Sequence, residues 1–207
     1  MNPFAIIRWL ASSTLLALSL VAGQAAANPY PLLVQVFVHQ DVRESTESLE
    51  YNYLAHWAKN MKKITGREVS FEYITEANGI TTMDYKQNDL SATLEAVSTL
   101  SFQYSDTYER ERDGVLQWQL LLTRDPLHGS TGGIAQERGS RIAIASLQAY
   151  NIPAHELGHM LGATHDDAEA GWCDTYMVST RNSLKAQCYR YSEANEQRIA
   201  QYFKNRR

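Results

Sequence analysis

The sequence lacks the features of a nucleic-acid-binding or a repetitive protein. Its 19 lysines and arginines are scattered, and 23 aspartates and glutamates outnumber them, which gives a formal charge of −4. Nucleic-acid binding requires a basic patch or stripe, so nucleic acid is not expected as a partner. No internal repeat, low-complexity tract or linker interrupts the chain. A chain of 207 residues without these features predicts one globular domain.

A hydrophobic run long enough to cross a bilayer is also missing. The apolar segment Leu10–Val21 is shorter than the roughly 20 residues that a transmembrane helix needs. Arg8 precedes this segment and Ala25-Ala26-Ala27 follows it, which is the pattern of a secretory signal peptide with its cleavage site. A membrane anchor is the alternative. We therefore expect a signal peptide at residues 1–27 and one domain at residues 28–207, exported to the periplasm or the medium.

Strand and helix patterns alternate along the rest of the chain. Short β-branched and aromatic runs predict strands, and apolar residues at helical spacing predict helices. Strands are expected at Leu32–Val38, Glu68–Ile74, Val115–Thr123 and Arg141–Ala145, and helices at Ser48–Thr65, after Asn88 or Asp89, from about Asn151, and after Ser192. This order predicts an α/β layer sandwich built on one mixed sheet.

The segment from residue 155 to residue 166 reads HELGHMLGATHD. His155 and His159 are four residues apart, so a helix projects both imidazoles from one face, where they can bind the same zinc ion. Glu156 lies between them, placed to accept a proton from a water molecule that the metal activates. Gly162 can adopt the positive φ that ends a helix, and that turn brings His165 round as a third ligand. A core helix with satisfied histidines is the alternative, but burying three unpaired histidines has a large polar cost and no structural benefit.

This motif resembles that of the metzincin metalloproteases, which read HExxHxxGxxH and carry a methionine turn further along the chain. Met177 stands twelve residues after His165, where that methionine is expected. Asp166 directly after the third histidine, Cys173 shortly before the methionine, and Cys188 ahead of a final helix are most similar to the adamalysin/reprolysin branch. The resemblance implies a mixed twisted sheet with an antiparallel edge strand, a zinc helix and a C-terminal helix. It also implies one catalytic Zn²⁺.

Two cysteines in an exported chain are expected to form a disulfide, with two buried free thiols as the alternative. A Cys173–Cys188 bridge would close a 15-residue loop, which stabilises a fold by roughly 3 kcal/mol in the chain-entropy model. The loop contains Met177, which in the family packs a soft apolar floor beneath the ligands. The bridge would therefore brace the floor of the zinc site as well as the fold.

The resemblance also indicates where a substrate would bind. Metzincins bind extended peptides against an edge strand above the zinc, and Gly133, Ile134 and Ala135 stand where that strand should lie; a plain Gly-Gly loop is the alternative. The segment from Val178 to Leu184 would line a pocket for a substrate side chain, and Arg181 or Lys185 could bias that pocket or point to solvent.

Acidic residues surround the motif. The resemblance implies that Asp166 supports the site through hydrogen bonds, although it could be an ordinary loop residue. Asp166 also belongs to a group of acids that could bind calcium, with Asp167, Glu169 and Asp174. The group lacks the spacing of an EF-hand, so a solvated acidic loop is favoured over a calcium site, and the calcium requirement stays open.

Three functions are compatible with these residues. The leading hypothesis is an exported zinc endopeptidase that acts on protein or peptide substrates with Glu156 as general base. A module that binds peptides without turnover is the second, but such a module has no need of a base. Hydrolysis of a non-protein amide, as in cell-wall peptide, is the third, because the chemistry at zinc is the same. The sequence predicts no oligomeric state.

Overall fold

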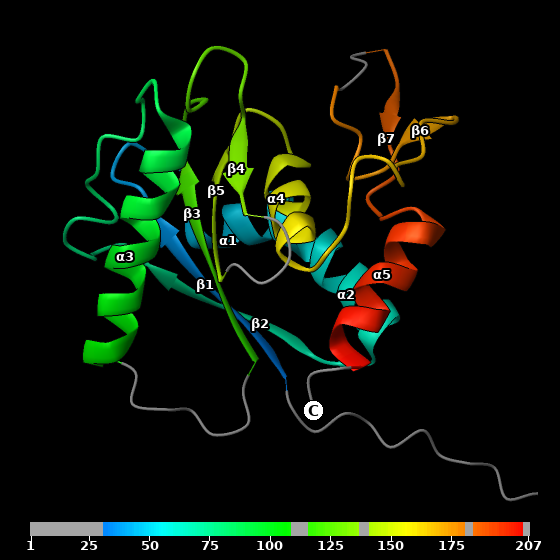
Figure 1. Cartoon of the computed structure of the whole chain (residues 1–207), viewed down its shortest axis with the longest axis horizontal. Helices are drawn as coiled ribbons and strands as arrows, with labels where there is room; N and C mark the ends of the chain where they lie inside the picture. The colour runs from blue at the N-terminus through cyan, green and yellow to red at the C-terminus, as the bar shows by residue number, and fades with distance from the viewer. Residues whose placement is uncertain (1–30, 109–115, 137–140, 181–183, 205–207) are drawn as a thin grey trace, which may run out of the picture.

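A five-stranded mixed sheet forms the centre of the computed structural model, which describes residues 31–108, 116–136, 141–180 and 184–204 (Figure 1). The strand order is β2-β1-β3-β5-β4. The strands are β1 Leu32–Val38, β2 Val69–Ile74, β3 Leu116–Thr123, β4 Gly133–Ala135 and β5 Ile142–Ser146. All neighbouring pairs are parallel except β4 with β5. The predicted α/β fold with a mixed sheet and an antiparallel edge strand is confirmed.

Helices cover both faces of this sheet (Figure 1). α3 packs on one face, and α1, α2, α4 and α5 lie on the other. The helices are α1 Thr46–Leu49, a π-helical turn Glu50–Leu54, α2 Ala55–Thr65, α3 Leu90–Tyr108, α4 Ile152–Met160 and α5 Glu193–Lys204. A second small sheet pairs β6 Cys173–Asp174 with β7 Ala186–Gln187 in parallel.

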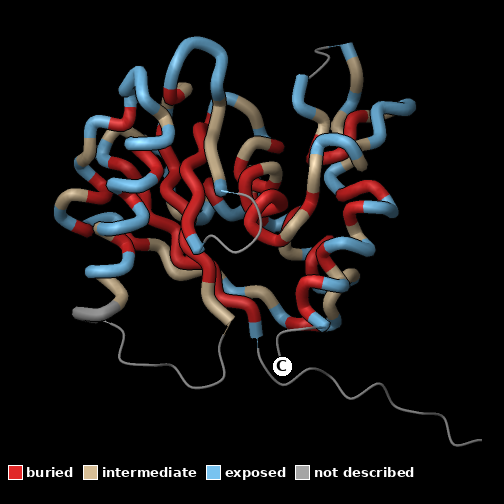
Figure 2. Tube along the Cα trace, viewed as in Figure 1, coloured by how far each residue is buried: buried red, intermediate tan, exposed pale blue. Residues whose placement is uncertain are grey.

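The central strands are buried because they are covered on both faces (Figure 2). Every residue of β1 and β5 is buried, as expected for parallel strands between two helical layers. Alternate side chains enter different cores. Val36 and Leu120 pack in the cluster beneath α2, α4 and α5, whereas Phe37 and Leu121 pack in the cluster beneath α3. The period of two along each strand divides the core into two layers.

The helix ends differ in detail from the expectation. The first helix begins at Thr46 rather than Ser48, because the Ser45 side chain caps it by accepting a hydrogen bond from the Ser48 N–H. It ends at Thr65, as predicted, and the following Gly66 caps it with a φ of 69°. Asp89 caps α3, because its Oδ1 accepts a hydrogen bond from the Ala92 N–H at 3.0 Å. Ser192 caps α5, as predicted, by accepting from the Asn195 N–H at 3.2 Å.

Some expectations fall on parts of the chain that are not described. The expected signal peptide at residues 1–27 lies within residues 1–30, the beginning of the third expected strand lies within residues 109–115, and part of the expected pocket segment lies within residues 181–183. None of the helices in the described ranges combines the length and the apolar character that crossing a bilayer requires.

Core packing leads to a test of this fold. Leu120 on β3 is fully buried, so Leu120→Ala should lower the free energy of unfolding by about 2–5 kcal/mol through lost burial and the cavity left behind. Leu184→Ala removes the same atoms from a side chain that is 93% exposed and should change stability by less than about 0.5 kcal/mol. Urea denaturation of both variants measures the difference. Similar losses in the two variants would contradict the assignment of Leu120 to the core.

Candidate metal centre

The centre is built on α4 and on the turn that ends this helix. α4 places His155 and His159 one turn apart. Gly162 follows with a φ of 88°, and its N–H donates to the carbonyl of His159 at 3.0 Å. This left-handed conformation favours glycine; it ends the helix and turns the chain back so that His165 faces the other two histidines.

The three imidazoles meet at their Nε2 atoms. The separations are 3.2 Å between His155 and His159, 3.1 Å between His159 and His165, and 2.9 Å between His165 and His155. Tetrahedral zinc with bonds of about 2.0–2.1 Å would place its ligand nitrogens roughly 3.3 Å apart, so the triad fits around one ion. Within the described part of the chain, no other group of three His, Cys, Asp or Glu side chains brings its ligand atoms this close together.

His155 is held as a neutral ligand by its surroundings. Its Nδ1 lies 2.7 Å from the carbonyl oxygen of Tyr176. Because that oxygen can only accept, Nδ1 carries the proton and the lone pair of Nε2 is left for a metal. Burial lowers the pKa of His155 to about 4, helped by the other two histidines and opposed by the bond to Tyr176. The imidazole is therefore uncharged at neutral pH, as a metal ligand must be.

Glu156 lies between α4 and the edge strand β4. Its side chain is buried, and burial raises the pKa of its carboxyl group to about 8. A cation at the three imidazoles would act in the opposite direction and favour the carboxylate. Gly133 of β4 makes room for this side chain: a Cβ there would lie 2.6 Å from Glu156 Cγ and 2.7 Å from its Oε1. The edge strand and the expected base are thus in direct contact.

Met177 packs tightly against α4 at a second glycine. It is fully buried, and a Cβ added to Gly158 would lie 2.6 Å from its Sδ and 2.7 Å from Cε1 of Tyr191. Gly158 therefore lets the methionine and the tyrosine ring approach the helix backbone. This contact places Met177 beside the helix that carries two of the three histidines.

A buried hydrogen-bond chain connects α2 to the first turn of α4. The indole N–H of Trp57 donates to the hydroxyl of Tyr191 at 2.8 Å, and that hydroxyl donates to the carbonyl of Ala154 at 2.7 Å. The ring of Tyr176 meets Tyr191 edge-on, with centroids 5.1 Å apart. The chain fixes the rotation of α4 just before His155. These partners lie far apart in sequence, and no local pattern identifies them.

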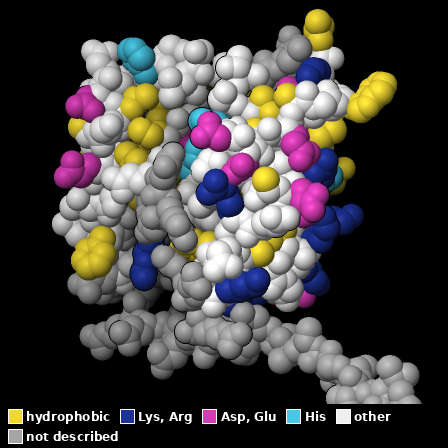
Figure 3. Space-filling model, turned by 45° about the vertical axis from the view of Figure 1, so that its right-hand side comes forward, with side chains coloured by type: hydrophobic (Ala, Val, Ile, Leu, Met, Phe, Trp, Pro, Cys, Tyr) yellow, Lys and Arg dark blue, Asp and Glu magenta, His cyan; other side chains and the backbone are white. Residues whose placement is uncertain are grey.

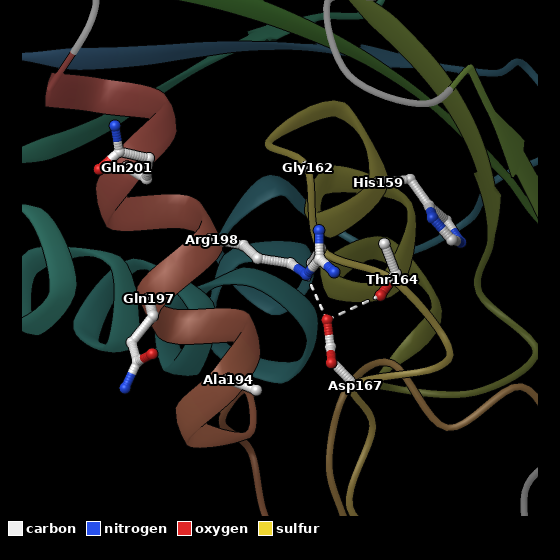
Figure 4. Close-up of a pocket in the computed structure, with 9 residues that line it drawn as sticks. His159, Gly162, Thr164, Asp167, Ala194, Gln197, Arg198 and Gln201 are labelled. Atoms are coloured by element: carbon white, nitrogen blue, oxygen red, sulfur yellow. Dashed lines mark hydrogen bonds and ion pairs between the residues drawn. The ribbon is translucent and has the colours of Figure 1, made fainter.

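The segment after α4 lies against α5 (Figure 4). A cavity of about 640 Å³ lies between parts of the two. It is lined by His159, Gly162, Ala163, Thr164, Asp167, Ala194, Gln197, Arg198 and Gln201. The Arg198 guanidinium and the Thr164 hydroxyl both donate to the carboxylate of Asp167. Figure 3 shows histidine side chains near the centre of one face of the molecule, bordered by acidic and basic groups.

The hydrogen bonds expected of Asp166 are made by its neighbour. Asp166 is exposed, and among the described residues it makes no side-chain hydrogen bond, whereas Asp167 pairs with Arg198. The reason is geometric, because the turn after His165 directs Asp167 toward α5. The other two acids of the group considered for calcium face cations: Glu169 lies 3.6 Å from Arg190, and Asp174 lies 3.8 Å from Lys185.

The predicted disulfide is present, and it closes the loop that contains Met177. Cys173 and Cys188 are bridged, with Cα atoms 5.2 Å apart. The bridge joins β6 to the residue after β7, so it staples this small sheet. Lys185 donates to the carbonyl of Ala170 at 3.0 Å, which holds its ammonium against the segment just before Cys173. Arg181 lies outside the described residues.

Comparison with known proteins finds similarity at the level of structure. The sequence matches no protein-family model and no curated protein. Among solved structures, metalloproteinase-II from Bacteroides fragilis superposes with a TM-score of 0.61 at 17% sequence identity, over 86% of this chain. The chain covers 55% of that protein, about half of its length. The two share the fold, and this chain places a group of three histidines that can bind a metal on it.

The close packing at Gly158 predicts the cost of adding one methyl group. Gly158→Ala should lower the free energy of unfolding by about 1–2 kcal/mol, because overpacking against Met177 and Tyr191 exceeds the gain in helix propensity. Gly171→Ala is the matched control, since a Cβ there meets nothing within 4 Å. Chemical denaturation of both variants provides the measurement. A stabilised Gly158→Ala protein would show that this packing is not tight.

Proposed function

We propose that the chain is an exported zinc-dependent endopeptidase of the metzincin type, with a motif most similar to the adamalysin/reprolysin branch. The observation that carries the proposal is the convergence of three Nε2 atoms within 3.2 Å, with the buried Glu156 between two of these histidines on α4. The shared fold with a protein described as a metalloproteinase supports it. A module that only binds peptides would not need a buried acid beside its metal ligands.

His155, His159 and His165 would hold the metal, and their number fits a catalytic site in which one coordination position stays open. Zinc bound there supplies a Lewis acid, which polarises a peptide carbonyl and lowers the pKa of water toward neutrality. Glu156 accepts the proton of the attacking water and then delivers it to the amine that leaves. Its neighbour on β4, Gly133, keeps this carboxyl group on the side of the helix that faces the edge strand.

The edge strand offers a place for the substrate backbone. β4 pairs with β5 on one side and is the last strand of the sheet, so its other edge is open for pairing within the described structure. An extended peptide could add to Gly133, Ile134 and Ala135 as a further strand. Because Gly133 also touches Glu156, a peptide on this edge would pass close to the proposed base. Protein or peptide substrates therefore fit better than small amides.

Two features of the chain support export. The N-terminal segment has the pattern of a signal peptide, and the Cys173–Cys188 disulfide belongs to an oxidising compartment such as the periplasm or the extracellular medium. The disulfide also lies within the proposed active-site region, so folding in that compartment and assembly of the metal centre are coupled.

Substitution of the proposed base tests the mechanism. Glu156→Gln should keep one zinc per chain but reduce cleavage of casein by about 10²–10⁴-fold, because the amide cannot accept the proton. Glu95→Gln, an exposed change on α3 across the sheet, should leave the rate unchanged. Removal of zinc with a chelator should stop cleavage by the wild type, and added zinc should restore it.

Two results would contradict the proposal. Cleavage by Glu156→Gln at the wild-type rate would show that Glu156 is not the base. Release of fragments from purified peptidoglycan, with no cleavage of casein, would instead identify a cell-wall amide as the substrate. Metal analysis of the purified wild type completes the test, because a chain without stoichiometric transition metal cannot use this chemistry.

A further inference from the structure

The third histidine differs from the other two in how its position is set. His155 and His159 project from a regular helix, and His155 is also fixed by its bond to the Tyr176 carbonyl. His165 lies in an irregular segment and is exposed. Within the described part of the chain, its Nδ1 makes no hydrogen bond. Its imidazole is therefore placed mainly by the backbone on either side of it.

That backbone is held by one buried amide on α5. The Thr164 N–H donates to Oδ1 of Asn195 at 2.8 Å, and Nδ2 of Asn195 donates to the Thr164 carbonyl at 3.0 Å. The backbone N–H and the backbone carbonyl of Thr164, the residue before His165, are thus both bound by the side chain of Asn195. Asn195 has no exposed surface, so water does not compete for these bonds.

Two further side chains, from the cap of α5 and from α5 itself, hold Asp167, two residues after His165. The Ser192 hydroxyl donates to the Asp167 carbonyl, and Arg198 pairs with the Asp167 carboxylate. Ser192 also accepts the Asn195 N–H, which anchors the amide at the start of the helix. The segment from Thr164 to Asp167 is therefore fixed to α5 on both sides of His165.

We propose that Asn195 is a positioning residue for the metal centre: by holding the backbone of Thr164 it sets the place of His165 and so raises the affinity for zinc. This inference rests on the proposed function, since it requires that the three histidines bind the metal. Without the amide, His165 has more positions available and a bound ion must order it. Partners that orient ligands typically change metal affinity by about 10–100-fold.

A purely structural clamp between α5 and the turn is the competing explanation, and a buried glutamine away from the metal centre provides the control. Gln119 on β3 donates to Oε1 of Gln35 at 3.0 Å and to the Ser105 hydroxyl at 2.9 Å. It is nearly as buried as Asn195, and it joins the sheet to α3. Unlike Asn195, it is not hydrogen-bonded to a residue next to a metal ligand.

The test compares Asn195→Leu with Gln119→Met in the full chain. Both changes roughly keep the side-chain size and remove the hydrogen bonds, so both should lower the melting temperature of the metal-free protein. Zinc affinity is measured by competition with a chromogenic chelator under conditions where both variants are folded. We expect about 10–100-fold weaker binding for Asn195→Leu and wild-type binding for Gln119→Met. Raising free zinc should restore cleavage by Asn195→Leu.

Two further variants keep the test decisive if Asn195→Leu does not fold. Asn195→Asp retains the acceptor for the Thr164 N–H but loses the donor, so its zinc affinity should fall between those of wild type and Asn195→Leu. Thr164→Pro removes the N–H that Asn195 binds, and it too should weaken zinc binding. Wild-type affinity in the Asn195 and Thr164 variants, or an equal loss in Gln119→Met, would overturn the inference alone. A wild-type protein that binds no zinc would overturn the proposed function and this inference together.

Discussion

Three imidazole nitrogens facing one another within about 3 Å are the constraint on which the rest of this structure depends. When their protons are on Nδ1, neutral imidazoles arranged in this way direct lone pairs at a common point, where the lone pairs repel one another unless a cation lies between them. The surrounding protein must therefore hold them there. It does so with a helix for two histidines, a glycine turn for the return of the chain, and bonds from the Met177 segment and α5.

α4 is the element that all of these contacts share. The edge strand reaches it at Glu156 through Gly133, and the methionine packs against it at Gly158. α2 reaches its first turn through the Trp57–Tyr191–Ala154 chain. The contacts at Gly133 and Gly158 require glycine, because a side chain at either position would occupy space that a neighbouring residue already fills. Glycines near the motif thus serve packing as well as chain reversal.

The sequence predicted the parts of the molecule that are encoded locally. The spacing of His155 and His159, the positive φ at Gly162 and the pattern of buried strands all follow from rules that act over a few residues. The disulfide could be predicted because the chain has only one possible pair. The edge strand at Gly133 was predicted from a family resemblance, since a Gly-Gly pair by itself also suits a turn.

The parts that could not be predicted depend on contacts between distant residues. Tyr191 and Asn195 lie outside the motif, and their roles come from where the last helix packs. The pairing of Asp167, rather than Asp166, with Arg198 has the same origin. Asp166 and Asp167 are chemically identical in sequence, and only the position of Arg198 on α5 decides which of them is bound. Sequence patterns over a few residues therefore cannot predict which of the two aspartates is bound.

The two halves of the triad are consequently held by different parts of the protein. His155 and His159 belong to α4, which is fixed by the sheet and α2, whereas His165 belongs to a segment bound to α5. An ion held by all three histidines would join α4 to the segment bound to α5. Its binding free energy would therefore stabilise the packing of α5 against the rest of the domain. The cavity between α5 and the histidine segment leaves part of that boundary unpacked. Hydrogen bonds from Ser192, Asn195 and Arg198 carry the contact there, which makes the geometry of the third ligand depend on polar bonds more than on apolar packing.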